Sequence, residues 1–254
     1  MRYVLCAMRS LCTLYSALCT LYVMPAWLSQ LQRDIVACEL CPRLRAHCSK
    51  IAREKRRAYL DWEYWGKPVP GFGDPAARVL VIGLAPGAHG SNRTGRPFTG
   101  DGSGNFLYAV LHDAGFASQP HATHKNDGLK LKGLYITSVG RCAPPANKPT
   151  PRELANCAPF LDRELAGLTR VTVVVALGRI AFDGYLAALL RAGVIASRSG
   201  YPFAHGARHQ LPHGITLLCA YHPSLQNTNT GKLTRGMLLD VFRSAALIAK
   251  TNAK

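Results

Sequence analysis

The stretch VLVIGLAPGAHGSNRTGRPFTGD, residues 79–101, decides the fold. Residues 79–84 are apolar and rich in β-branched side chains, which is typical of a strand buried on both faces of a parallel sheet. From Pro86 to Gly104, prolines and glycines follow so closely that the pattern excludes both strand and helix. Open α/β sheets bind ligands at the carboxyl ends of their strands. We therefore expect a central strand that leads into a long ligand-binding loop.

This loop has no phosphate-binding motif. Neither G-x-G-x-x-G nor G-x-x-x-x-G-K-[ST] occurs in it, which disfavours a nucleotide-phosphate loop. The side chains that it does carry suit a flat, polar, partly anionic ligand: Asn92, Arg93, Arg96, Phe98 and Asp101.

Strand and helix patterns alternate along the rest of the chain. Three further strands are expected at 134–139, 172–177 and 217–220. An amphipathic helix with Ser29 as its N-cap runs from Leu28 towards Cys38, and further helices are expected at 105–114, 151–165, 179–190 and 234–249. The alternation predicts an α/β fold in which helices cover both faces of a mainly parallel four-stranded sheet.

The composition indicates a nucleic-acid partner. The 254 residues carry a formal net charge of +17, with a pI of about 9.8. A basic surface is the electrostatic signature of a protein that binds nucleic acid. The plain alternative is a basic surface that is merely solvated.

Residues 1–23 differ from everything that follows them. The pentapeptide LCTLY occurs at 11–15 and again at 18–22. The apolar stretch lacks a small-x-small cleavage site and is too short for a membrane span. We expect a leader or upstream extension, with translation starting at Met24 and a single domain at 24–254.

Four cysteines have the spacing of a metal centre. Cys38 and Cys41 form a C-x-x-C pair, while Cys142 and Cys157 stand fifteen residues apart after the second expected strand. Such thiolates can hold zinc or an iron-sulfur cluster, and spacing alone does not separate the two. Cys48 could replace any one of them, and ordinary buried cysteines remain the alternative. Because the chain is too large to need disulfide staples, we expect a reducing cytoplasm.

Polar groups at the mouths of different strands converge on one edge of the expected sheet. They are Asp101, Asn147, His222 and Asn227. Singly, Asp101 could cap the following helix, and Asn147 and His222 could be turn residues. Because the loops that carry them open on the same edge of a parallel sheet, we expect a site there.

Longer motifs in the same loops resemble a known family. GLAPGAHGSNRTGRPFTGD, VGRCAPPANKPTPRELANCAPFL and YHPSLQN are similar to motifs of the family 5 (UDGb-type) uracil-DNA glycosylases, and CELCPRL resembles their amino-terminal cluster motif. The resemblance covers the chain from about residue 35 to the final helix. It implies a three-layer α/β/α fold around a small, mainly parallel four-stranded sheet. It also implies a 4Fe-4S cluster held by Cys38, Cys41, Cys142 and Cys157.

The implied activity is removal of uracil, and of other deaminated bases such as hypoxanthine, from double-stranded DNA, which leaves an abasic site. Asp101 would support the oxocarbenium ion and orient water, His222 would donate to the departing base, and Asn147 would read its edge or hold the water. Leu84 and Ser138 replace polar residues of the related family 4, which should relax uracil specificity. The remaining expected site residues line the base pocket (Gly83, Ala85, Pro86, Gly87, Phe98, Ser138 and Asn227) or contact DNA (Arg93, Arg96, Ser224, Leu225 and Gln226).

A second class of function fits the same charge and cysteines. A metal-stabilised nucleic-acid-binding module without catalysis would not need a carboxylate in the glycine-rich loop. A nucleotide-dependent enzyme is disfavoured because the chain lacks a phosphate motif. We expect a monomer that acts on DNA in the cytoplasm of a bacterium or archaeon, near the nucleoid, and not at a membrane.

Overall fold

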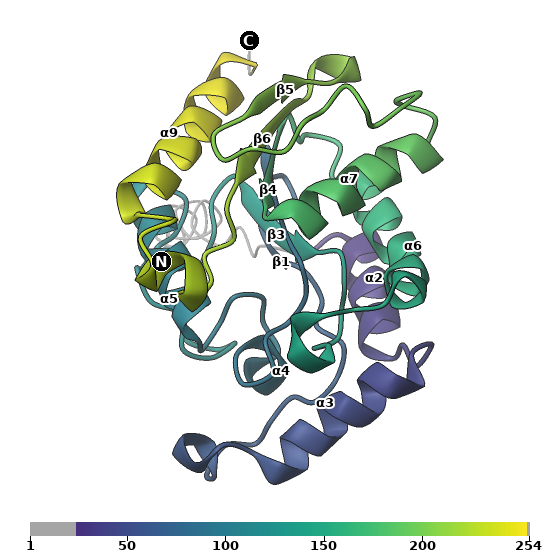
Figure 1. Cartoon of the computed structure of the whole chain (residues 1–254), viewed down its shortest axis with the longest axis vertical. Helices are drawn as coiled ribbons and strands as arrows, with labels where there is room; N and C mark the ends of the chain where they lie inside the picture. Colours follow the sequence, from purple (N-terminus) through teal and green to yellow (C-terminus); the bar gives the residue numbers. More distant parts are fainter. Residues whose placement is uncertain (1–23, 253–254) are drawn as a thin grey trace, which may run out of the picture.

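A computed structural model describes residues 24–252 and shows an α/β fold around one six-stranded sheet (Figure 1). The strand order is β1-β3-β2-β4-β6-β5. The four inner strands are mutually parallel, and each edge strand is antiparallel to its neighbour. The strands are β1 (Phe72–Gly73), β2 (Val79–Gly83), β3 (Leu134–Ser138), β4 (Val173–Leu177), β5 (Arg208–Gln210) and β6 (Thr216–Ala220).

The four parallel strands are those that the sequence predicts, so the central sheet is confirmed, but a sheet of only four strands is wrong. The missed strands, β1 and β5, are two and three residues long and only partly buried. Neither contains an apolar run, because each lies at an edge and owes its place to pairing with β3 or β6. The fully buried inner strands carry the readable signal.

Helices cover both faces of the sheet, as a three-layer fold requires. The helices are α2 (Ala26–Val36), α6 (Pro151–Gly167) and α7 (Arg179–Arg191) on one face and α5 (Gly102–Asp113) and α9 (Arg235–Thr251) on the other (Figure 1). Successive residues of β2 enter different cores, since Val79 and Val81 pack under α5 and α9 whereas Leu80 and Ile82 pack under α2, α6 and α7. The alternation of side chains along the strand produces the two cores.

Two helix starts show where local signals hold and where they fail. At α6 the Thr150 side chain accepts the Glu153 N–H while Glu153 reaches back to the Thr150 N–H, so the predicted capping box is confirmed. At α2 the predicted N-cap Ser29 is wrong, because the helix already begins at Ala26, after Pro25. Leu28 lies within the first turn and is buried against the sheet.

Three helices were not predicted. They are α3 (Pro42–Glu54), α4 (Ser91–Thr94) and α8 (Leu225–Asn229). The expectation of a glycine-rich loop free of helix is therefore wrong at α4 and at the start of α5. Gly104 lies within α5, where a glycine is not expected. A Cβ at this position would overlap the Phe98 carbonyl oxygen, so close packing, and not chain flexibility, explains the glycine.

Residues 1–23, where a leader or extension is expected, lie outside the described residues. Within residues 24–252, no helix is both long and apolar enough to cross a bilayer.

Candidate active site

A pocket of about 480 Å³ opens at the carboxyl ends of β2, β3 and β6. The long loop after β2 contributes most of its wall, and the loops after β3 and β6 close it. The lining residues include Leu84, Ala85, Pro86, Gly87, His89, Gly90, Phe98, Asp101, Ser138, Asn147, His222, Ser224 and Gln226. Chain segments more than a hundred residues apart thus meet at the edge of the sheet where the sequence predicts a site.

Asp101 uses its two carboxylate oxygens differently. Oδ1 accepts the Gly104 N–H at 2.9 Å and caps α5. Oδ2 lies over the backbone of Gly87 and Gly90 and has no hydrogen-bond partner among residues 24–252. Asp101 is therefore a helix cap that still presents one free oxygen to the pocket.

Burial raises the pKa of the Asp101 carboxyl above its ordinary value. The N–H groups of Gly104 and Ser103, followed by the charge of Arg93, oppose this rise because they favour the ionised form. A partly desolvated carboxylate with a free oxygen can stabilise a nearby positive charge or accept a proton from water.

Gly90 makes room for this carboxylate. A Cβ at Gly90 would overlap Asp101 Oδ2 and Cγ, and one at Gly87 would come within 2.8 Å of Oδ2. We expect Gly90→Ala to displace the Asp101 side chain and lower catalytic activity at least tenfold, a prediction checked by single-turnover kinetics. The matched control is Gly236→Ala on α9, where a Cβ has space and activity should not change.

His222 faces the pocket from the end of β6. Its ring lies 5.8 Å from that of Phe98, centroid to centroid. Burial lowers the pKa of His222 to about 4, so the imidazole is neutral at pH 7. Since no group in the described part of the chain hydrogen-bonds its ring nitrogens, a neutral N–H donor is left available in the pocket.

The two predicted asparagines occupy different places. Asn147 lines the pocket in a left-handed backbone conformation, with φ +55°. Asn227 does not line the pocket. Its Nδ2 instead donates to the His222 carbonyl oxygen at 2.8 Å. We interpret Asn227 as the residue that holds the His222 turn in place.

The pocket wall formed by Phe98, Ser138 and Leu84 offers few polar groups. Phe98 supports one side and fits closely against Gly83, where a Cβ would meet its ring at 2.8 Å. The Ser138 hydroxyl donates to the Gly140 carbonyl at 2.7 Å and is thus already occupied. Leu84, the departure from the related family 4, lines the pocket.

Arg93 and Arg96, expected to contact phosphates, are each 3% exposed. Arg93 donates to the carbonyls of His89 and Gly100 at 2.8 and 2.6 Å, and the rings of Tyr59 and Trp62 lie against its guanidinium group. Tyr59 and Trp62 are half-buried, and their rings cover the buried Arg93 side chain.

The Arg96 guanidinium group is also occupied. It forms a bidentate ion pair with Asp127 at 2.8 and 2.7 Å and donates to the Thr99 hydroxyl. Arg93 Nη1 has no hydrogen-bond partner in the described part of the chain, but it is buried, so neither arginine presents an accessible guanidinium group to a phosphate. Both side chains stabilise the loop through their contacts within it.

The segment after β6 that is expected to contact DNA, Ser224 to Gln226, lies beside the pocket. Ser224 caps α8 by accepting the Asn227 N–H with its side chain. Leu225 is 57% exposed and packs against Gly102, and Gln226 lines the pocket. An exposed leucine beside a pocket is the arrangement that an inserting side chain needs.

Sequence reasoning missed His89. It lines the pocket from within the quoted stretch, and its Nδ1 lies 3.1 Å from the Tyr64 hydroxyl. The sequence did contain a signal for this residue: His89 is the one titratable side chain in the Gly-Ala-His-Gly stretch of residues 87–90.

The four predicted metal-binding cysteines come from three parts of the chain: Cys38 and Cys41 lie between α2 and α3, Cys142 lies in the loop after β3, and Cys157 lies on α6. Cys41, Cys48 and Cys142 share one buried cluster, and the thiols of Cys38 and Cys41 interact electrostatically with Cys157. The six cysteines of the described part are free thiols, including the remote Cys219 in β6. As the side chains stand, no three His, Cys, Asp or Glu residues in residues 24–252 are arranged around a metal ion.

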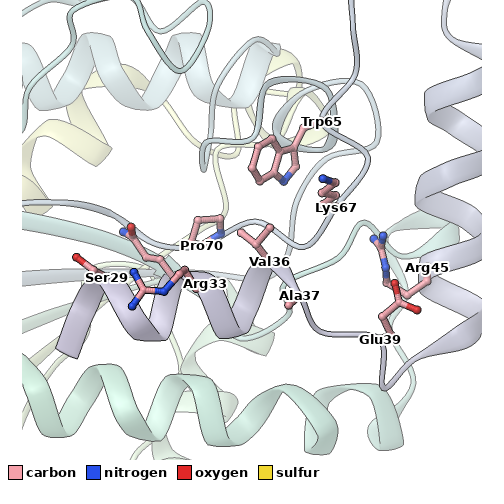
Figure 2. Close-up of a pocket in the computed structure, with 10 residues that line it drawn as sticks. Ser29, Arg33, Val36, Ala37, Glu39, Arg45, Trp65, Lys67 and Pro70 are labelled. Atoms are coloured by element: carbon pink, nitrogen blue, oxygen red, sulfur yellow. The ribbon is translucent and has the colours of Figure 1, made fainter. Parts of the chain in front are cut away.

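A second cavity, of about 730 Å³, lies between α2 and the segment from Trp65 to Pro70 (Figure 2). Arg33, Arg45, Glu39 and Lys67 contribute its charges. Neither the Asp101 carboxylate nor the His222 imidazole lines this second cavity. The smaller pocket is therefore the better candidate for chemistry despite its size.

Comparisons with known proteins agree with this geometry. The sequence model of the uracil DNA glycosylase superfamily matches residues 70–246. The type-5 uracil-DNA glycosylase of Thermus thermophilus is 54% identical over 85% of this chain and 96% of its own length, and that of Pyrobaculum aerophilum is 41% identical over 87% and 92%. The type-4 enzyme of Thermotoga maritima is 29% identical over 72% and 83%. The chain therefore belongs to the uracil DNA glycosylase superfamily, within it to the type-5 uracil-DNA glycosylases.

Proposed function

We propose that the protein removes uracil from double-stranded DNA by hydrolysing the N-glycosidic bond, as a monofunctional base-excision repair enzyme that leaves an abasic site. One observation carries this proposal: the free Oδ2 of Asp101 and the neutral ring of His222 face a single pocket. The names of the type-5 relatives support the choice of uracil in DNA. The protein acts as a monomer in the cytoplasm, where the nucleoid supplies its substrate.

Breaking the glycosidic bond separates charge, and the two side chains match the two charges. Positive charge develops on the sugar, and Asp101 stabilises it while Oδ2 accepts a proton from the attacking water. Negative charge develops on the departing base, to which His222 donates an N–H hydrogen bond. Because this imidazole is already neutral, it assists as a donor without the loss of a full positive charge. Asn147 holds the water or the edge of the base.

The base must leave the duplex to reach this pocket. Leu225, with Ser224 and Gln226 beside it, fills the gap in the helix while the flipped base stacks on Phe98. Phosphate contacts come from exposed lysines of the same loops, Lys148 beyond Asn147 and Lys232 beyond α8, since Arg93 and Arg96 are buried.

The substrate range is broad. The Ser138 hydroxyl already donates to the Gly140 carbonyl oxygen, and the Leu84 side chain has no hydrogen-bonding group. The pocket therefore requires few hydrogen bonds from a bound base. Hypoxanthine is therefore released as well as uracil.

The decisive experiment treats duplexes containing uracil or hypoxanthine with purified protein and scores abasic sites. Release of both bases is expected. Tight binding without base release would instead identify a metal-stabilised, non-catalytic DNA-binding module.

The cysteines fit a 4Fe-4S cluster by the chemistry of the donor set. Cys38, Cys41, Cys142 and Cys157 are thiols in one region, and three of them are almost fully buried. Asn156 Nδ2 donates to Cys41 Sγ at 3.3 Å. Soft thiolates with N–H donors are what an iron-sulfur cluster requires. When bound, it would tie α3 and α6 to the loop after β3, a structural contribution remote from the reacting atoms.

Anaerobically purified protein should contain about four iron atoms per chain. Cys142→Ala should lose iron and become insoluble, because the cluster ties distant segments together. Cys219→Ala, in β6, and Cys48→Ala should both keep iron. Metal analysis that finds zinc without iron would contradict the assignment, and loss of iron in Cys48→Ala would make Cys48 a ligand.

A further inference from the structure

His89 and Tyr64 form a pair in the wall of the pocket to which the proposed reaction gives no role. Tyr64 Oη lies 3.1 Å from His89 Nδ1, and the two rings meet edge to face at a centroid distance of 6.1 Å. Tyr64 is 8% exposed, whereas His89 lines the pocket. The pair therefore connects the buried Tyr64 ring to the place where a base would bind.

We assign the direction of this hydrogen bond from its partners. Tyr64 carries one hydroxyl proton, and His89 Nδ1 is the acceptor that residues 24–252 place within hydrogen-bond distance of it, so Tyr64 donates and His89 Nδ1 accepts. A neutral imidazole that accepts at Nδ1 carries its proton on Nε2. His89 therefore presents an N–H donor on the side of the ring away from Tyr64.

The environment also keeps His89 neutral. Burial lowers its pKa, and the positive charges of Arg56 and Arg93 lower it further. His89 Nε2 has no hydrogen-bond partner in residues 24–252 and is not sealed from the pocket. The pocket thus contains, besides His222, a second neutral donor whose orientation is fixed by its partner.

We propose that His89 is a specificity residue whose Nε2–H donates to the exocyclic carbonyl oxygen that deamination puts in place of an amino group. In uracil this oxygen is O4, and in hypoxanthine it is O6. The inference rests on the proposed function and extends it to base selection. An amino group at that position would set donor against donor and leave both unpaired, so the pocket would reject cytosine and adenine.

This assignment explains how a permissive pocket remains selective. Leu84 and Ser138 supply no free hydrogen bond, yet the deamination oxygen is common to uracil and hypoxanthine. One fixed donor can read that shared feature in bases of different size. Thymine carries the same oxygen, so His89 does not exclude it.

The test measures single-turnover release from duplexes containing uracil or 4-thiouracil, whose sulfur is a weak hydrogen-bond acceptor. His89→Ala should lower release of uracil about tenfold, the effect of one lost hydrogen bond, and release of 4-thiouracil less than threefold. Tyr64→Phe should give a smaller loss on uracil alone, because His89 can then change tautomer. His121→Ala, an exposed histidine outside the pocket, is the control and should change neither rate.

Each other outcome overturns the inference. Equal losses on both bases would make His89 a structural residue, and no loss would remove it from base recognition. Thermal unfolding of each variant separates misfolding from a change in recognition. Wild-type protein that releases no uracil would refute the proposed function itself, a failure visible before any variant is compared.

Discussion

Asp101→Asn should release uracil at least on the order of a hundredfold more slowly than the wild type while still folding and binding DNA. The reason is that the two carboxylate oxygens of Asp101 have different roles: Oδ1 caps α5, and Oδ2 faces the pocket. An asparagine Oδ1 can still accept the Gly104 N–H and cap α5, since Asn caps a helix as well as Asp does. The substitution removes only the negative charge and the basic oxygen over Gly87 and Gly90.

The measurement is single-turnover release from a uracil duplex, with binding to the same duplex measured in parallel. His222→Ala serves as the comparison, because it removes the donor and leaves the anion. Binding should survive in Asp101→Asn, since an anion near the DNA backbone slightly opposes binding. Near-normal release would confine Asp101 to capping and transfer the handling of water to Asn147.

The pH profile provides a second readout of the same group. Asp101 must be ionised to act, and burial raises its pKa, so wild-type release should fall as the pH drops through this raised value. The residual release of Asp101→Asn should lack that acidic limb. A limb that persists unchanged in the variant would belong to another group.

The central fold was predictable because its signal is local. Each inner strand is an apolar run buried on both faces, and the Thr150 capping box marks a helix start by itself. The edge strands β1 and β5 were not predictable, since pairing with a neighbour, and not side-chain pattern, makes them strands. Helix α3 was missed because its charged residues hide the two buried positions, Leu44 and Cys48.

The location of the site could be predicted from the sequence, but most of the contacts between its side chains could not. Parallel strands guarantee that the loops with Asp101 and His222 meet. Sequence does not tell that Asn227 turns to the His222 carbonyl or that the Arg93 guanidinium group is enclosed by Tyr59 and Trp62. These contacts depend on packing between distant segments, and so does the pairing of His89 with Tyr64.

Glu164→Gln should destabilise the protein by about 3–5 kcal/mol, the cost of leaving a buried charge without its partner. Glu164 on α6 is 0% and Arg141 is 1% exposed at the side chain, and their closest atoms lie 2.6 Å apart. The Thr137 hydroxyl donates to Glu164 at 2.6 Å and accepts from Arg141 at 2.7 Å. A globular protein has only about 5–15 kcal/mol of total stability, so the loss is a large part of it.

The measurement is equilibrium urea unfolding of the variant and the wild type, under conditions that keep any bound metal in place. Asp162→Asn on the same helix is the matched control. Its ion pair with Arg191 is equally short, at 2.6 Å, but both side chains are more than 40% exposed. That pair should contribute less than about 1 kcal/mol.

The double variant Arg141→Met with Glu164→Leu distinguishes loss of a contact from burial of a lone charge. If the penalty of Glu164→Gln comes from the stranded guanidinium group, replacing both charges by apolar groups should recover much of the stability. Arg141 immediately precedes Cys142, and its carbonyl accepts the Val69 N–H beside the pocket. The single variant should therefore also loosen the loop after β3 and reduce retention of iron, whereas the double variant should retain it. A double variant as unstable as the single one would mean that Arg141 is needed for its own contacts, independently of Glu164.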